Sequence, residues 1–325
     1  MNKKIFWSIL WVMMLGTCVL AEAKKVHTLG DSTMANYDES ATVPRGWGMY
    51  FGNFLTGDWT SVNYARGGRD SRSGYNELWA AAKSKVEAGD YVIIQFSHND
   101  EMFNGVDREE LYNYYIAKGE TATAAALDGR GTHPSTTYKA YLKKIVDEVQ
   151  ALGANPILVG PVCRAYFGSD GKITRTGQHD LGDKFDKLEN GVLSSGNKVS
   201  ADDNSMDYPY YMQQLATEEG IPYIDMTNAT KSLYESYGKE RCLSELFSVK
   251  VSNGETVADA THFNTTGALL AARMCAQLMK EAGILADNIT IPVDLSVSPE
   301  SGDMGDIYNG QTGTKEFTLN GFGLD

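Results

Sequence analysis

The sequence predicts an α/β fold in which a parallel sheet of about five strands is covered by helices on both faces. Short apolar segments typical of strands alternate along the chain with longer segments in which apolar residues recur at a helical period. One short segment, 91–96 (YVIIQF), is almost entirely apolar, as expected for a strand buried on both faces of a parallel sheet. Hydrophobic residues form 42% of the 325-residue chain, which is enough for a sizeable core.

The individual elements follow from the same periodicities. Strands are expected over the short apolar segments 25–29, 61–63, 91–96, 156–159 and 222–225. Helices are expected over the longer periodic segments 46–55, 78–86, 138–152, 208–219 and 265–282. In 46–55 the evidence is a set of aromatic residues near a 3.6-residue period, and in 265–282 it is a high alanine content. In a parallel sheet, functional side chains gather at the carboxyl ends of the strands.

Three segments do not fit this alternation. The polar segments 101–137 and 164–207 are too long for ordinary connections, and loops of this length usually form walls or lids of functional sites. The tail, 288–325, is glycine-rich and strand-like, and it resembles the opening strands of an immunoglobulin-like module but is too short to complete one. We therefore expect one domain over 24–287, followed by a β-rich extension.

The first 23 residues have the organisation of a secretory signal peptide. Two lysines precede an almost wholly apolar run at 5–20, and Ala21 and Ala23 supply the small side chains that a signal peptidase requires. A bilayer-spanning helix needs about 20 apolar residues, and this run is shorter and contains polar residues. We therefore expect cleavage after Ala23, no membrane span, and a secreted or periplasmic protein.

Charge and cysteine content exclude several classes of function. The formal charge is −13, so the chain lacks the basic excess that nucleic-acid binding needs, and adhesion to anionic membranes is disfavoured. Beyond the predicted signal peptide, Cys163, Cys242 and Cys275 allow at most one internal disulfide, and we favour buried free thiols. No Cys-x-x-Cys spacing indicates a zinc or redox site. The sequence leaves the oligomeric state open.

A serine follows the first predicted strand, within the sequence Gly-Asp-Ser-Thr-Met at 30–34. At the carboxyl end of a parallel strand, the side chain of Ser32 is exposed beside backbone N–H groups, which suits a nucleophile. The alternative is that Ser32 caps a following helix, a common role for serine. Met34 stands where the second glycine of a Gly-x-Ser-x-Gly elbow would be, so the common α/β-hydrolase arrangement is not indicated.

Other predicted strand ends carry groups that fit acyl-transfer chemistry. After the second strand, Gly67 and Gly68 let backbone N–H groups approach a ligand; after the third, the Asn99 amide can donate to an oxyanion. Asp259 precedes His262 by three residues, so it can accept the Nδ1–H and leave Nε2 free as a base. Each feature alone has an ordinary alternative. The glycines can simply form a turn and the asparagine an Asx turn, while the spacing of Asp259 and His262 can arise by chance or indicate a metal pair.

Taken in chain order, these residues resemble the SGNH branch of the GDSL hydrolases. Its conserved blocks correspond here to Ser32, Gly68, Asn99, and Asp259 with His262. Four segments resemble the rhamnogalacturonan acetylesterases in particular: Gly-Asp-Ser-Thr-Met at 30–34, Gly-Trp-Gly at 46–48, Asn-x-Ala through Gly-Arg to Arg-Ser over 63–73, and His-Asn-Asp at 98–100. The likeness covers about residues 25–285. It departs from the family at Ser97, where glycine is usual, and in the segment 164–207.

The resemblance implies a flavodoxin-like three-layer α/β/α sandwich and a secreted carbohydrate esterase that removes acetyl groups from pectic rhamnogalacturonan, with no metal or other cofactor. It implies that Ser32 attacks the ester carbonyl, that His262 carries the proton, and that Asp259 orients the imidazole. The N–H groups of Ser32 and Gly68 and the amide of Asn99 would form the oxyanion hole. The expected partner is an acetylated polysaccharide or oligosaccharide.

Three further side chains are candidates for binding the substrate. Arg69 and Arg72 follow Gly68 closely, so they either meet galacturonate carboxylates or brace the loop through hydrogen bonds to carbonyl groups. Trp47 can stack on a sugar ring, although its helical spacing favours a place in the core.

Two alternatives to this function remain at the sequence level. The first is an acetylesterase that acts on another glycan, such as acetylxylan. The second, from a different class, is a catalytically silent carbohydrate-binding protein, which would keep the fold but not a working triad; here every catalytic residue type is present. A lipase should show an apolar rim, whereas the two long segments are polar and charged.

Overall fold

The computed structural model describes residues 23–40, 43–292, 294–298 and 318–322. Its centre is a five-stranded sheet in the order β2-β1-β3-β4-β7, in which every neighbouring pair is parallel. The strands are β1 (Lys25–Gly30), β2 (Thr60–Asn63), β3 (Tyr91–Gln95), β4 (Asn155–Val159) and β7 (Tyr223–Ile224). The predicted parallel sheet is therefore confirmed. Of the predicted signal peptide, residues 1–22 lie outside the described residues.

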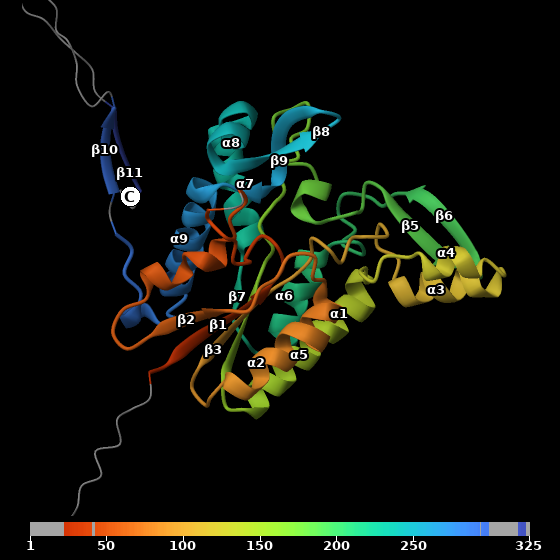
Figure 1. The fold of residues 1–325 in the computed structure, drawn as a ribbon, viewed down its shortest axis with the longest axis horizontal. Helices are drawn as coiled ribbons and strands as arrows, with labels where there is room; N and C mark the ends of the chain where they lie inside the picture. The colour runs from red at the N-terminus through yellow and green to blue at the C-terminus, as the bar shows by residue number, and fades with distance from the viewer. Residues whose placement is uncertain (1–22, 41–42, 293, 299–317, 323–325) are drawn as a thin grey trace, which may run out of the picture.

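Helices cover both faces of the sheet, as predicted (Figure 1). Successive side chains of a strand point to opposite faces, so Ile93 joins one core layer while Val92 and Ile94 join the other. The layer around Ile93 is completed mainly by α7 (Met226–Tyr237), α8 (Lys239–Leu246) and α9 (Thr265–Glu281). The opposite layer is completed by η3 (Gly74–Trp79), α2 (Ala80–Ala82), α5 (Lys139–Ala151) and α6 (Tyr208–Glu219).

Residues 46–55 form two short 3₁₀ turns, η1 (Trp47–Met49) and η2 (Phe51–Phe54), where the sequence predicts a helix. Gly46 and Gly48 explain the difference. A Cβ at either position would overlap the main chain that follows Ser32, so the segment packs against that main chain more closely than a regular helix could. The N–H of Trp47 donates to Thr33 O at 2.8 Å, which ties the segment to the Ser32 turn.

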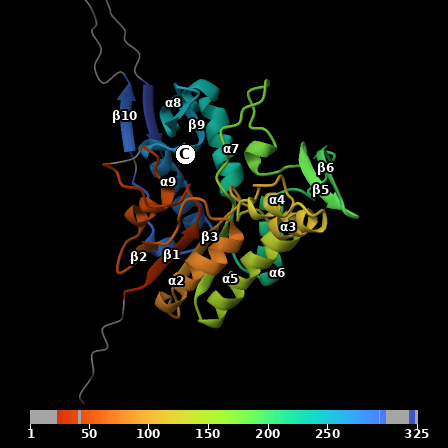
Figure 2. The ribbon, with the colours of Figure 1, turned by 45° about the vertical axis from the view of Figure 1, so that its right-hand side comes forward.

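Both long polar segments contain regular structure. The first holds α3 (Arg108–Ala117) and α4 (Thr121–Ala125), and the second holds the antiparallel hairpin β5 (Phe185–Glu189) and β6 (Val192–Asn197). These elements lie together on one side of the molecule in both ribbon views (Figure 1 and Figure 2). The long polar segments therefore build a lobe beside the sheet.

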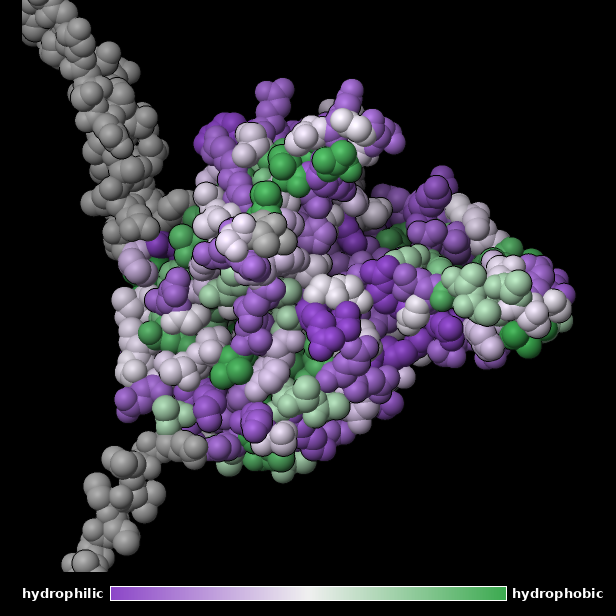
Figure 3. Space-filling model, viewed as in Figure 1, coloured by the Kyte–Doolittle hydropathy of each residue, from purple (hydrophilic) through white to green (hydrophobic). Residues whose placement is uncertain are grey.

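A second hairpin, β8 (Phe247–Ser252) and β9 (Glu255–Phe263), lies outside the five-stranded sheet. Periodicity did not predict either hairpin, although both turns contain Asn-Gly with positive φ at both residues, the signature of a type I′ turn. Figure 3 shows a hydrophobic patch over this second hairpin, where Val249, Val251 and Val257 are exposed.

Residues near both ends of the predicted domain contact the loop that precedes β2. The carbonyl of Lys24 accepts a hydrogen bond from Thr60 N at 3.1 Å, and that of Asn288 accepts one from Thr56 N at 2.8 Å. Both ends therefore lie at the amino-terminal edge of the sheet. Beyond them, β10 (Asp294–Ser298) and β11 (Thr318–Phe322) form a separate antiparallel pair. Most of the predicted immunoglobulin-like extension lies outside the described residues.

Cys163, Cys242 and Cys275 are free and buried, as the sequence analysis favours. Burial raises the pKa of the Cys163 and Cys242 thiols to about 12, so both are protonated at neutral pH. Within the described residues, no helix is long and apolar enough to cross a membrane.

Candidate active site

Ser32, His262 and Asp259 form a continuous hydrogen-bonded chain. Ser32 follows the end of β1, and residues 32–34 form a turn with no helix after it, so the helix-cap alternative is wrong. Ser32 Oγ lies 3.0 Å from His262 Nε2, and His262 Nδ1 lies 2.8 Å from Asp259 Oδ2. Both partners stand on β9, Asp259 at its middle and His262 next to its last residue. The structure thus brings together three residues that are separated by up to 230 positions in the chain.

Asp259 is suited to orient the imidazole. Partial burial acts to raise the pKa of Asp259, but the hydrogen bond and charge of His262, together with Thr261 N–H and Lys250, lower it below its ordinary value. The carboxylate is therefore ionised at neutral pH and accepts the Nδ1–H of His262. This tautomer leaves Nε2 without a hydrogen, so Ser32 Oγ–H donates to it.

The turn that carries Ser32 is fixed from behind by Asp31. This buried carboxylate accepts hydrogen bonds from Thr33 N and Thr33 Oγ1, both at 2.8 Å, and lies 3.1 Å from His98 Nδ1. Burial acts to raise the pKa of Asp31, but His98 and Thr33 bring it down to about 2. Burial also lowers the pKa of His98 to about 4. His98 is therefore a neutral, packed donor to Asp31.

The loop with Gly67 and Gly68 passes directly beside Ser32. A Cβ built on Gly67 would lie 3.7 Å from Ser32 Cβ, so the backbone here is close to the hydroxyl-bearing side chain. Gly68 has φ of +73°, a left-handed conformation that favours glycine. The backbone conformation therefore favours glycine at position 68, whereas a side chain at position 67 would make only an ordinary contact with Ser32.

Asn99 is held against the same loop. Its Nδ2 donates to Arg69 O at 3.0 Å, and its Oδ1 accepts from Arg130 Nη1 at 2.8 Å. Since Arg69 directly follows Gly68, the amide of Asn99 lies beside the second glycine. Ser32, Gly68 and Asn99, predicted from three separate strand ends, therefore converge on one place in the structure.

A known protein family matches the part of the chain that carries these residues. The model of the GDSL-like lipase/acylhydrolase family matches residues 28–268, which covers all of the sheet except the first half of β1, and all the residues just described. The chain belongs to this family. As a GDSL-family member with esterases among its relatives, it is a carboxylic ester hydrolase.

Two of its relatives are named rhamnogalacturonan acetylesterases. The protein from Emericella nidulans is 40% identical over 277 residues, covering 84% of this chain and 92% of the relative. RhgT from Bacillus subtilis is 29% identical over 267 residues, covering 80% of this chain and 91% of the relative. The crystal structure of the Bacillus subtilis protein YXIM matches 80% of this GDSL chain with a TM-score of 0.53 at 23% identity. This chain spans only 57% of that protein, and the likeness shows the fold.

The GDSL site includes side chains that the sequence analysis missed. Glu101 follows the His-Asn-Asp block and lies against His179 Nδ1 and, at 2.7 Å, Arg164 Nη1; both partners come from the second long segment. Burial acts to raise the pKa of Glu101, but Arg164 and His179 bring it down to about 2. Arg164 Nη2 also donates to His98 O at 2.9 Å. These contacts join the lobe to the segment that carries Asn99.

Trp47 lies in the core, as its spacing favours, and its candidate role in stacking on a sugar is wrong. Its ring is fully buried and its Nε1 donates to Gln95 Oε1 at 3.2 Å, so no face is open to a sugar. Arg72 is paired with Asp107 at 2.6 Å and only 12% of its side chain is exposed, so it braces the loop. Arg69 donates to Gly67 O and to Glu77, which also favours the bracing alternative.

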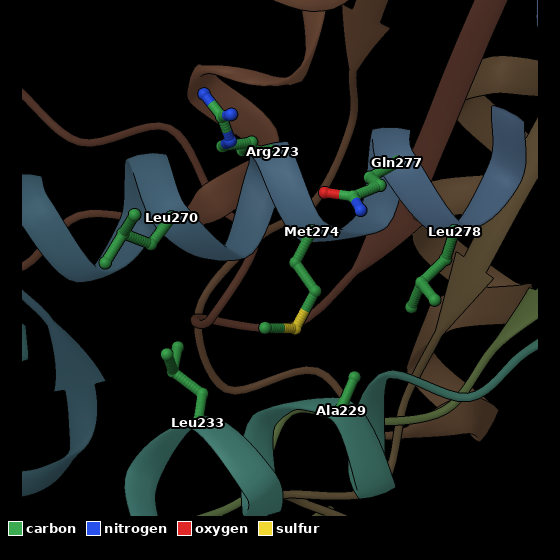
Figure 4. Close-up of a pocket in the computed structure, with 7 residues that line it drawn as sticks. All are labelled: Ala229, Leu233, Leu270, Arg273, Met274, Gln277 and Leu278. Carbon is green, nitrogen blue, oxygen red and sulfur yellow. The ribbon is translucent and has the colours of Figure 1, made fainter. Parts of the chain in front are cut away.

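A separate apolar cavity of about 240 Å³ lies between α7 and α9. In Figure 4, Leu233, Leu270 and Met274 point into it, while Arg273 points away. None of the residues that line it belongs to the site around Ser32.

Within the described residues, no group of three or more His, Cys, Asp or Glu side chains could hold a metal ion, so the metal-pair interpretation of Asp259 and His262 lacks a third ligand.

Proposed function

We propose that this protein is a secreted acetylesterase that removes acetyl groups from rhamnogalacturonan by a serine acyl-enzyme mechanism. The observation that carries the chemistry is the chain from Ser32 Oγ through His262 to Asp259, with distances of 3.0 and 2.8 Å. Two relatives that match more than nine tenths of their own length are named for this substrate, and one of them is 40% identical. The signal-peptide pattern of residues 1–23 supports secretion.

In the first half of the reaction, Ser32 Oγ bonds to the acetyl carbonyl carbon as its proton moves to His262 Nε2. Asp259 stabilises the imidazolium that forms and holds its orientation. The tetrahedral intermediate collapses when the bond from carbon to the sugar oxygen breaks. His262 then gives its proton to that oxygen, which leaves as a sugar hydroxyl.

In the second half, water takes the place of the sugar hydroxyl. His262 Nε2 removes a proton from the water as its oxygen attacks the acetyl-Ser32 carbonyl, and the proton returns to Ser32 Oγ as acetate leaves. In both halves the carbonyl oxygen gains negative charge. The N–H groups of Ser32 and Gly68 and one hydrogen of Asn99 Nδ2 would donate to it, and each such donor is worth about 3 kcal/mol.

The test is the release of acetate from acetylated rhamnogalacturonan and, in parallel, from acetylated xylan. The wild type is compared with Ser32→Ala, whose folding is checked by its thermal transition. We expect release from the pectic polymer that is lost in Ser32→Ala. Equal release from both polymers would keep the serine esterase and overturn the pectic substrate. A folded wild type that releases acetate from neither polymer would point to a silent carbohydrate-binding protein.

A further inference from the structure

The oxyanion-hole candidate Asn99 has a charged neighbour from an unexpected part of the chain. Arg130 lies between α4 and the next helical turn, in the first long polar segment, where no sequence motif indicates a role. Its Nη1 donates to Asn99 Oδ1 at 2.8 Å. The same nitrogen would lie 3.9 Å from a Cβ built on Gly68. The guanidinium thus stands beside both elements that would donate to the oxyanion.

Arg130 is itself held firmly in place. Its Nε and Nη2 donate to the two carboxylate oxygens of Asp128 at 2.8 and 2.7 Å, a bidentate pairing that fixes the plane of the guanidinium. The hydrogen bonds from Arg130 lower the pKa of Asp128 to about 2, so the pair is ionised at neutral pH. The next two residues are anchored as well: Gly131 N donates to Asp70 and Thr132 N to Asp100 O.

The contacts on the two ends of the Asn99 amide allow one orientation only. Arginine has donors but no acceptor, so only Oδ1 can face Arg130. Arg69 O accepts but carries no hydrogen, so only Nδ2 can face it. Nδ2 has two hydrogens, and Arg69 O uses one. The second remains for a ligand. A flipped amide would instead present its oxygen to the developing oxyanion, which would repel it.

We propose that Arg130, braced by Asp128, is a positioning residue that fixes the Asn99 amide as a donor to the oxyanion and strengthens that donor. A cation on the carbonyl end of an amide draws electron density from its nitrogen, so the N–H bonds to an anion more strongly. The effect is largest in the transition state, where the negative charge develops. The inference rests on the proposed function, because it concerns the same oxyanion.

The test is a double-mutant cycle between Arg130 and Asn99, measured by steady-state hydrolysis of a small activated acetate ester. Arg130→Met removes the donor at similar length, and we expect kcat to fall about 10- to 100-fold with KM changed less than about twofold. Asn99→Ala should lower kcat about 10²- to 10³-fold. In the Asn99→Ala background, Arg130→Met should change kcat less than about twofold, because Arg130 acts through the amide.

Two controls separate positioning from a general structural effect. Arg130→Lys keeps one donor and the charge, so it should recover part of the activity that Arg130→Met loses. Arg241→Gln breaks an exposed ion pair with Glu245 on α8, and it should leave kcat and the thermal transition unchanged.

Several outcomes would overturn the inference. Losses that multiply in the double mutant would mean that Arg130 acts independently of Asn99, and a rise in KM at constant kcat would mean that it binds substrate. Wild-type kcat in Arg130→Met, with Ser32→Ala inactive, would reject the inference alone. If the wild type did not hydrolyse the ester, or if Ser32→Ala remained active, the proposed function itself would fail.

Discussion

Two regions flank Ser32, the hairpin that carries Asp259 and His262 and the segment that carries Asn99, and they differ in how firmly they are held. Asp259 and His262 stand on the β8–β9 hairpin, which pairs with no strand of the five-stranded sheet and exposes Val251 to the extent of 75%. Asn99 follows β3, the central strand, and the next two residues are embedded in polar networks. Asp100 accepts from Ser71 and Thr132, and Glu101 is enclosed by Arg164 and His179.

The difference matches what each side has to do. A proton carrier serves two oxygens in turn, the serine Oγ and the departing hydroxyl, so its support tolerates small movements. An oxyanion donor acts only if it already points at the place where charge develops, so it must not move. We infer that rigidity is concentrated on the Asn99 side, and the following predictions test this contrast.

The largest effect is expected on the hairpin side. Asp259→Asn keeps the shape but makes the side chain donate to His262 Nδ1, which places the imidazole hydrogen on Nε2, where it faces Ser32. We expect kcat to fall about 10⁴-fold with little change in the thermal transition. The fall in kcat is measured by steady-state kinetics with an activated ester. A loss of less than tenfold would mean that Asp259 does not set the tautomer.

A smaller but still large effect is expected at Asn99. Asn99→Asp replaces the amide donor by a carboxylate, and we expect kcat to fall by at least the 10²- to 10³-fold typical of a lost oxyanion donor. Arg130 would still pair with one oxygen of the new carboxylate, but the other oxygen would face the Arg69 carbonyl, so we also expect a lower melting temperature. Measuring kcat and the melting temperature of Asn99→Asp and the wild type separates lost catalysis from lost folding. A variant with wild-type activity would show that the Asn99 amide does not stabilise the oxyanion.

The rigid side should also lose stability in acid. With a folded pKa of about 2 against an ordinary 4.5, ionised Glu101 contributes stability that is complete above about pH 5 and is lost as the pH falls through 2. Its loss corresponds to roughly 3 kcal/mol, or about a hundredfold in the unfolding equilibrium. We expect Glu101→Gln to melt at lower temperature than the wild type at pH 7, with the difference shrinking towards pH 2.

Thermal melts from pH 2 to pH 7 measure this difference. Glu245→Gln, which breaks only an exposed ion pair with Arg241, is the matched control and should follow the wild type at neutral pH. A Glu101→Gln variant as stable as the wild type at pH 7 would contradict the assignment of rigidity to this side.

The smallest effect is expected at Lys250. Its Nζ lies 3.8 Å from Asp259 Oδ1, but the side chain is 55% exposed, and exposed pairs contribute little. Lys250→Ala should change kcat less than about threefold and leave the melting temperature nearly unchanged. A change in kcat above tenfold would show that catalysis depends on the charge of Lys250 beside Asp259.

The sequence predicted those features that local patterns encode. Apolar runs such as 91–96 identified the strands, and short motifs at strand ends identified Ser32, Gly68 and Asn99, because the topology of a parallel sheet brings such ends together. The helix predicted over 46–55 failed because two glycines pack against neighbouring backbone, a contact that periodicity does not see.

The remaining parts of the site depend on contacts between distant segments. Arg130 meets Asn99 across 31 positions, and Arg164 meets Glu101 across 63, within loops that carry no period. Nothing in the local sequence marks these arginines among the others. The β8–β9 hairpin is different, since its Asn253-Gly254 turn was present in the sequence and identifies it once turn chemistry is considered.

The meeting of Lys24 and Asn288 at the loop before β2 has a consequence for engineering. The length of β1, about 20 Å, separates this junction from Ser32. A linker that starts beyond the buried Ile289 could join this end to Lys24, and new termini could be opened at the exposed Asn190-Gly191 turn, without cutting a strand of the central sheet. Such a circular permutant should retain its esterase activity. Because both ends lie at one place, the domain could also be inserted into a loop of a host protein.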